Sequence, residues 1–222
     1  MKGITSTLAA DFWEYMTQMY GAKVLPKDDD LIKIIRALKR KDLAGIARGL
    51  ADLNEGDEIG LIALFLSKLG HMDVADFMEG YSTTLGDRIY VPFTPGEEEP
   101  GQSLLRQVTT CVHELVHVRQ FRRAEVYGLS FAVRYLVDPA QRALYEAEAL
   151  RAGGEVLYFL SERELTKEQF VGRAEHLDAY GCSKKDIDVA KNYLAMSFKT
   201  IEAGGRIDTV AKRGVDWLER HL

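Results

Sequence analysis

The feature that most constrains this chain is the pentapeptide His113-Glu114-Leu115-Val116-His117, which lies inside a segment with helical spacing. Four residues span about one turn of an α-helix, so both imidazoles project from one face and can bind the same ion. The neighbouring positions are apolar on most sides, namely Val108, Cys111, Val112 and Val118. A solvent-facing helix with two chance histidines would instead be polar around its exposed side. We therefore expect a buried helix whose polar groups need partners, and a metal ion would supply them.

Composition excludes several classes of protein. The chain has 222 residues, a net charge of −5 and 46% hydrophobic residues, which are the values of an ordinary globular protein. The negative charge argues against nucleic-acid binding through bulk electrostatics. The longest apolar run, residues 59–66, is far shorter than the roughly 20 residues that cross a bilayer. With no secretory leader and only two cysteines, we expect a cytoplasmic protein that contacts neither nucleic acid nor membrane.

Periodicity predicts an α+β protein that is predominantly α-helical. We divide it into a helical N-terminal segment (1–80), a catalytic core (81–180) and C-terminal helices (181–222). Turn residues followed by β-branched and aromatic residues predict a strand over 88–93, where Pro92 marks an edge or a strand end. Helical spacing and capping residues predict helices over 31–38, 43–50, 57–69, 103–123, 140–160, 166–180, 183–203 and 208–222.

The pentapeptide favours zinc chemistry. Neutral imidazole suits zinc, and Glu114 is then placed to act as a general base on a zinc-activated water. Catalytic zinc sites use three protein ligands, so one more is needed. An extended three-histidine motif fails, because Gln120 and Arg123 occupy its Gly and His positions. The three other histidines, His71, His176 and His221, follow no pattern that ties them to the motif.

A carboxylate from a second helix is the best remaining ligand. The segment 145–149 contains Glu146 and Glu148 among alanines that permit close packing on the motif helix. These two residues lie about 200° apart around a helix, so only one of them can face the metal. Glu155 and Glu175 are the remaining alternatives.

Together, the motif at 113–117 and the segment 145–149 resemble the two signatures of the gluzincin-type zinc metallopeptidases, including their small bacterial and phage-borne members. The second signature of that family, E-x-E-A or E-x-x-x-[DN], follows H-E-x-x-H on a later helix, and the resemblance covers residues 81–160. It implies one zinc ion per chain with His113, His117 and Glu146 as ligands. Leu150 stands where the signature has Asp or Asn, so support for a ligating histidine must come from Glu148 or a backbone carbonyl.

The resemblance also implies a zincin-like core, in which an edge strand precedes the motif helix and the second ligand helix. A polypeptide substrate would then add to the 88–93 strand as a further β-strand. Glu114 would pass the water's proton to the leaving amine. Tyr135, Tyr145 and His176 are the candidate donors to the developing oxyanion.

A rival interpretation is a non-catalytic zinc-binding protein. The helical N- and C-terminal segments make up about half of the chain and could dock a protein partner. The intact Glu114 counts against this interpretation, since a purely structural zinc site needs only ligands.

Overall fold

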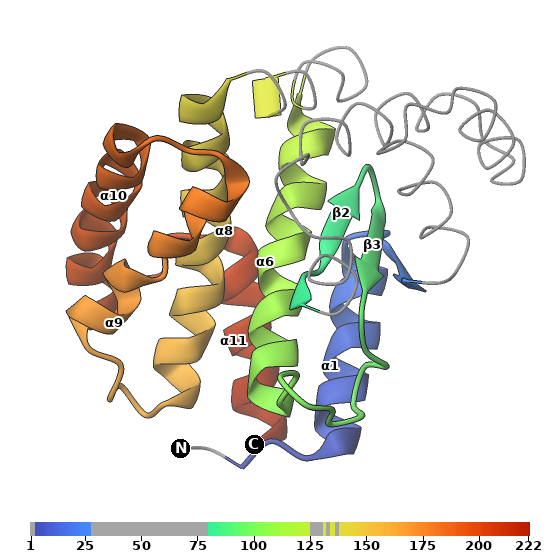
Figure 1. Cartoon of the computed structure of the whole chain (residues 1–222). Helices are drawn as coiled ribbons and strands as arrows, with labels where there is room; N and C mark the ends of the chain where they lie inside the picture. The colour runs from blue at the N-terminus through green and yellow to red at the C-terminus, as the bar shows by residue number, and fades with distance from the viewer. Residues whose placement is uncertain (1–2, 28–79, 125–130, 132–133, 136–137) are drawn as a thin grey trace, which may run out of the picture.

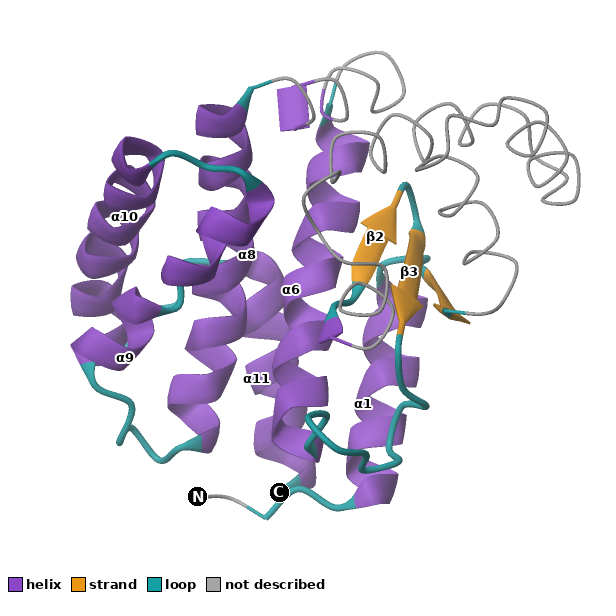
Figure 2. Cartoon of the chain, in the orientation of Figure 1, coloured by secondary structure: helices purple, strands orange, loops and turns teal. Residues whose placement is uncertain are grey.

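The computed structural model describes residues 3–27, 80–124, 131, 134–135 and 138–222. This part is mostly helical with a small sheet, which agrees with the expected α+β class at that coarse level (Figure 2). None of its helices combines the length and hydrophobicity that crossing a bilayer requires. The named elements are α1 (Ser6–Met19), β1 (Lys23–Pro26), β2 (Thr83–Leu85), β3 (Arg88–Val91), α6 (Leu104–Arg123), α8 (Pro139–Leu160), α9 (Lys167–Gly172), the 3-10 helix η1 (Glu175–Tyr180), α10 (Lys184–Glu202) and α11 (Thr209–His221).

Most of the predicted helices that fall within the described residues are present. Ser103 caps α6 through a hydrogen bond from the Arg106 amide, and Asp138 caps α8 in the same way. The helix predicted over 166–180 is wrong, because α9 ends at Gly172 and the tighter η1 follows. Glycine favours helix termination, which accounts for the break. The helices predicted over 31–38, 43–50 and 57–69, together with His71, lie outside the described residues.

The sheet corrects one expectation. It has three strands in the order β1-β3-β2, with β1 parallel and β2 antiparallel to β3. The strand predicted over 88–93 is β3, and it ends at Val91 before Pro92. It is the central strand and not an edge strand, because β1 and β2 flank it, and Pro92 marks the end of the strand. The sequence did not predict β1 and β2. Both are too short, at four and three residues, for an alternating pattern to reveal them.

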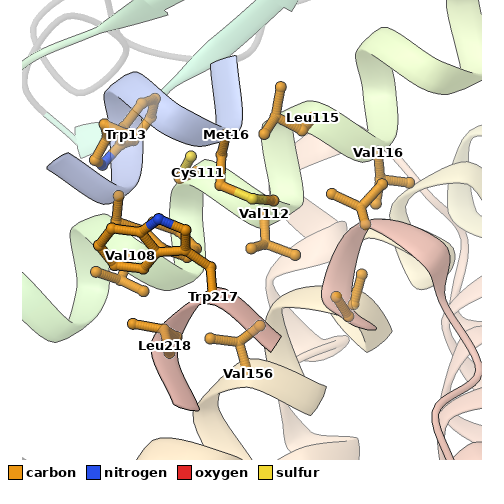
Figure 3. Packing of buried hydrophobic residues seen from close by; sticks show 14 of the residues in the cluster. Trp13, Met16, Val108, Cys111, Val112, Leu115, Val116, Val156, Trp217 and Leu218 are labelled. Atoms are coloured by element: carbon orange, nitrogen blue, oxygen red, sulfur yellow. The ribbon is translucent and has the colours of Figure 1, made fainter. Parts of the chain in front are cut away.

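Helix α6 lies at the centre of the fold, between α8 on one side and the sheet and α1 on the other (Figure 1). Its apolar face packs against α1 and α11 (Figure 3). The residues that fill this interface include Trp13, Met16, Val108, Cys111, Val112, Leu115, Val116, Trp217 and Leu218. Residues on either side of the boundaries at 80 and 180 thus share one core. The division into three segments stays a prediction.

A buried ion network ties α6 to α8 and α11. Asp208, at the start of α11, accepts two hydrogen bonds from Arg119 at 2.9 and 2.7 Å and one from Arg151 at 2.9 Å. Burial raises the pKa of the adjacent Glu155 to about 7. Asp208 is also buried, but Arg119 outweighs that burial and lowers its pKa. Because Arg119 follows His117 by two residues, this network fixes how α6 is rotated about its axis.

Two glycines let α8 approach its neighbours closely. A Cβ atom on Gly153 would lie 3.0 Å from the Thr109 carbonyl oxygen on α6. A Cβ atom on Gly154 would lie only 2.4 Å from the ring of Phe170, which is fully buried in α9. Helix α8 therefore sits against both α6 and α9 at distances that a side chain at either position would prevent.

We predict that Gly154→Ala destabilises the protein. Alanine ordinarily stabilises a helix interior by about 0.5–1 kcal/mol relative to glycine. Here the clash with the Phe170 ring should outweigh that gain and lower the free energy of unfolding by about 1–3 kcal/mol. Urea denaturation measures this. Gly172→Ala is the matched control, because nothing lies within 4 Å of its added Cβ. Equal stability of the two variants would contradict the close packing.

Candidate metal centre

Helices α6 and α8 bring three side chains together. His113 and His117 project from one face of α6, and their Nε2 atoms lie 3.2 Å apart. Glu146 projects from α8, with Oε2 3.4 Å from Nε2 of His113 and Oε1 3.4 Å from Nε2 of His117. His117 and Glu146 are buried, while the side chain of His113 is 16% exposed. The three side chains form a compact triangle that opens outward on the His113 side.

The dimensions of this group suit a bound metal ion. Ligand atoms about 2.0–2.1 Å from one tetrahedral ion lie roughly 3.3 Å from each other. The Nε2–Nε2 separation of 3.2 Å is close to this length, as are the two Nε2–oxygen separations of 3.4 Å, which involve the two different oxygens of Glu146. Oε2 of Glu146 is buried and accepts no hydrogen bond from the described residues, so it has a lone pair available. Within the described residues, these three form the group of metal-ligating side chains that can hold one ion.

The charges of the triangle favour a bound cation. Burial alone would lower the pKa of His117, but the Glu146 carboxylate raises it to about 9. For the acidic Glu146, burial alone would raise the pKa, but His117 and His113 hold it well below its ordinary value. Tyr135 adds a hydrogen bond of 2.5 Å to Oε1 of Glu146. The carboxylate is therefore ionised at neutral pH, and a metal ion would replace the proton on His117.

Gln120 orients His117 from the side away from the triangle. The Gln120 Oε1 atom lies 2.8 Å from Nδ1 of His117, and its Nε2 atom donates to the Tyr145 carbonyl and to Glu148. Because Oε1 can only accept, Nδ1 carries the proton and Nε2 faces the triangle. We expected this support from Glu148 or a backbone carbonyl. Glu148 and the Tyr145 carbonyl both contribute, but indirectly, because they hold Gln120, which contacts His117. The sequence analysis noted Gln120 only because it occupies the Gly position of the three-histidine motif.

The structure separates Glu146 from the other candidate ligands. Glu148 bonds to Gln120. Glu155 accepts hydrogen bonds from the backbone N–H groups of residues 207 and 208. Glu175 is exposed and pairs with Lys191 at 3.1 Å. Of the four carboxylates considered, Glu146 is therefore the one that the structure places beside the imidazoles.

Glu114 lies on the adjacent face of α6 and turns toward the sheet. Its side chain is only 5% exposed, and Oε2 accepts a 2.7 Å hydrogen bond from the Thr84 hydroxyl on β2. This contact leaves the other carboxylate oxygen for a further partner. The second strand of the sheet, which the sequence did not predict, thus holds the residue expected to act as base.

Aromatic and imidazole side chains surround the triangle. Tyr135 points its hydroxyl at Glu146, whereas Tyr145 packs on Phe131 with ring centres 4.8 Å apart. His176, on η1, lies against the ring of Tyr180. Burial raises the pKa of Tyr180 well above its ordinary value, and the charges of Glu146 and Glu114 raise it further. Sequence reasoning missed Tyr180, because nothing in the sequence places the end of η1 within electrostatic range of these carboxylates.

Comparison with known proteins returned no match to any protein-family model, curated protein or solved structure. The resemblance to gluzincins therefore rests on the two short signatures.

We predict that Gln120→Ala weakens zinc binding. Without the acceptor at Nδ1, His117 loses its fixed tautomer and orientation, which should raise the dissociation constant about 10–100-fold. Competition with a chromophoric chelator measures the constant. Gln18→Ala is the matched control, because it removes a side-chain amide from the exposed face of α1, far from the triangle. It should leave the dissociation constant unchanged. Wild-type affinity in Gln120→Ala would refute the assigned role.

Proposed function

We propose that this protein is a zinc-dependent metallopeptidase with His113, His117 and Glu146 as the zinc ligands and Glu114 as the general base. The observation that carries the proposal is the buried triangle of ligand atoms at 3.2–3.4 Å, with a buried carboxylate beside it. A structural zinc site is usually closed by four protein ligands, whereas a catalytic site has three. The three ligands and the partly exposed His113 support the catalytic interpretation.

Glu114 would carry the proton through the reaction. When bound, zinc supplies Lewis acidity, which makes water more acidic and polarises the peptide carbonyl. Glu114 would accept the proton of the attacking water and deliver it to the leaving amine, which keeps the charge balanced. Thr84 positions this carboxylate through the 2.7 Å hydrogen bond. His176 and Tyr180 on η1 carry N–H and O–H groups that would serve as donors to the developing oxyanion.

The sheet provides a place for an extended substrate. Since β3 is flanked on both sides, a peptide cannot add to it as we first expected. In the described part of the chain, β1 and β2 are the two outer strands, and β2 is the one that lies between β3 and α6 (Figure 1). Main-chain hydrogen bonds from this strand would hold a peptide alongside Thr84 and Glu114.

We predict that Glu114→Gln retains zinc but loses peptide cleavage. Glutamine keeps the size and the hydrogen bond to Thr84 but cannot accept a proton, so the rate should fall at least about 100-fold. Metal analysis and mass spectrometry of a mixed peptide library measure the two properties. Glu98→Gln, in an exposed loop, should behave as wild type.

Two outcomes would overturn the proposal. One is a zinc-loaded wild type that cleaves no peptide of the library. The other is a Glu114→Gln variant that cleaves as fast as the wild type. The first result favours the rival, non-catalytic function, and the second shows that Glu114 is not the general base.

A further inference from the structure

The histidine-bearing face of α6 continues toward the N-terminus of that helix. Arg106, Thr109, His113 and His117 follow the helical spacing of one stripe. Gly153, on α8, lies beside this stripe and has no side chain to fill the space there. The position of an added Cβ there lies 3.8 Å from the His113 Cβ and 3.3 Å from the Arg173 Nη2 atom. The Nη2 atom of Arg173, which follows the end of α9, and the Cβ atom of His113 therefore both lie within 4 Å of the same position on α8.

Arg173 differs from the other arginines near the core. Arg119 and Arg151 both pair with Asp208, and Arg142 donates to two backbone carbonyls. Within residues 3–27, 80–124 and 138–222, no hydrogen bond or ion pair joins Arg173 to another group. The side chain is partly buried, and burial lowers its pKa to about 10, so it is still charged at neutral pH. A charge in this setting needs an anionic partner.

The surroundings of Arg173 are positive on this side of the triangle. Burial lowers the pKa of His176, the Glu146 carboxylate raises it, and His113, Arg173 and Arg106 lower it further. His176 is thus within electrostatic range of both arginines. The Arg106 guanidinium is held nearby by a hydrogen bond of 3.1 Å to the Gly80 carbonyl. By contrast, the carboxylates of Glu114 and Glu148 accept hydrogen bonds from Thr84 and Gln120.

We propose that Arg173 binds a carboxylate of the substrate, one or two residues from the bond that is cleaved. This inference rests on the proposed peptidase function and names its substrate class: peptides with an anionic group on the His113 side. Consecutive residues are about 3.8 Å apart, so a group this close to His113 belongs to a residue next to the reacting carbonyl. A guanidinium binds a carboxylate through two parallel hydrogen bonds, which gives both affinity and orientation.

The carboxylate has two sources, the free C-terminus of a peptide or an Asp or Glu side chain. Peptide pairs distinguish them. One pair differs only in a C-terminal acid or amide, and the other has Glu or Gln beside the cleaved bond. In the zinc-loaded wild type, we expect kcat/KM to be about 10-fold or more higher for the acidic member of one pair. The ratio should fall to near one in Arg173→Gln and be partly restored in Arg173→Lys.

Arg123→Gln is the matched control, because it removes an exposed cation from the last turn of α6. It should keep the wild-type ratio. Equal ratios in wild type and Arg173→Gln, with cleavage still dependent on Glu114, would overturn the carboxylate subsite and leave the peptidase function standing.

A binding measurement tests the subsite without catalysis. Propionate and propionamide are titrated into the metal-free full-length chain, followed by NMR of the arginine Nε–Hε groups. We expect the resonance that is missing from Arg173→Gln to shift saturably with propionate and not with propionamide. If propionate gives this shift but the zinc-loaded chain cleaves no peptide, the peptidase function is refuted and the carboxylate subsite stands. Identical responses to both compounds would refute the subsite.

Discussion

The close packing of α8 on α6 is the constraint on which the candidate metal centre depends. Two histidines four residues apart form only one edge of a ligand triangle, and the third corner comes from another helix. Gly153 allows the backbones to approach until its Cβ position would be 3.0 Å from the Thr109 carbonyl oxygen. At that separation Glu146 reaches both imidazoles at 3.4 Å. A wider spacing would leave the buried Glu146 carboxylate with the hydrogen bond from Tyr135 but without the imidazoles that compensate its charge, which is costly.

Polar contacts outside the triangle hold it in this geometry. Gln120 fixes the ring of His117, and Thr84 fixes Glu114 from the other side. The Arg119–Asp208 pair anchors the next turn of α6 to α11. These groups come from α6, β2 and the start of α11, which are distant in sequence. The centre is therefore a property of the packed fold and not of the motif helix alone.

Periodicity and capping predicted most of the architecture, because both are local. Ser103 and Asp138 mark helix starts with the side chains that make the capping bonds. The ligand pair of α6 follows from the helical repeat alone, and the choice of Glu146 needed the resemblance to a known signature. Long-range contacts could not be predicted. The strands β1 and β2 are too short for a pattern, and nothing local to Gln120 or Tyr180 shows what these side chains face.

The central claim is that His113, His117 and Glu146 bind one zinc ion. The zinc K-edge X-ray absorption spectrum of the zinc-loaded chain tests it most directly. The account predicts one zinc per chain with two imidazole nitrogens at about 2.0–2.1 Å, a carboxylate oxygen and one further light ligand, all without sulfur. Replacing His117 by alanine should remove the bound metal. A chain that takes up no zinc, or a spectrum with sulfur ligands from Cys111 or Cys182, would contradict it.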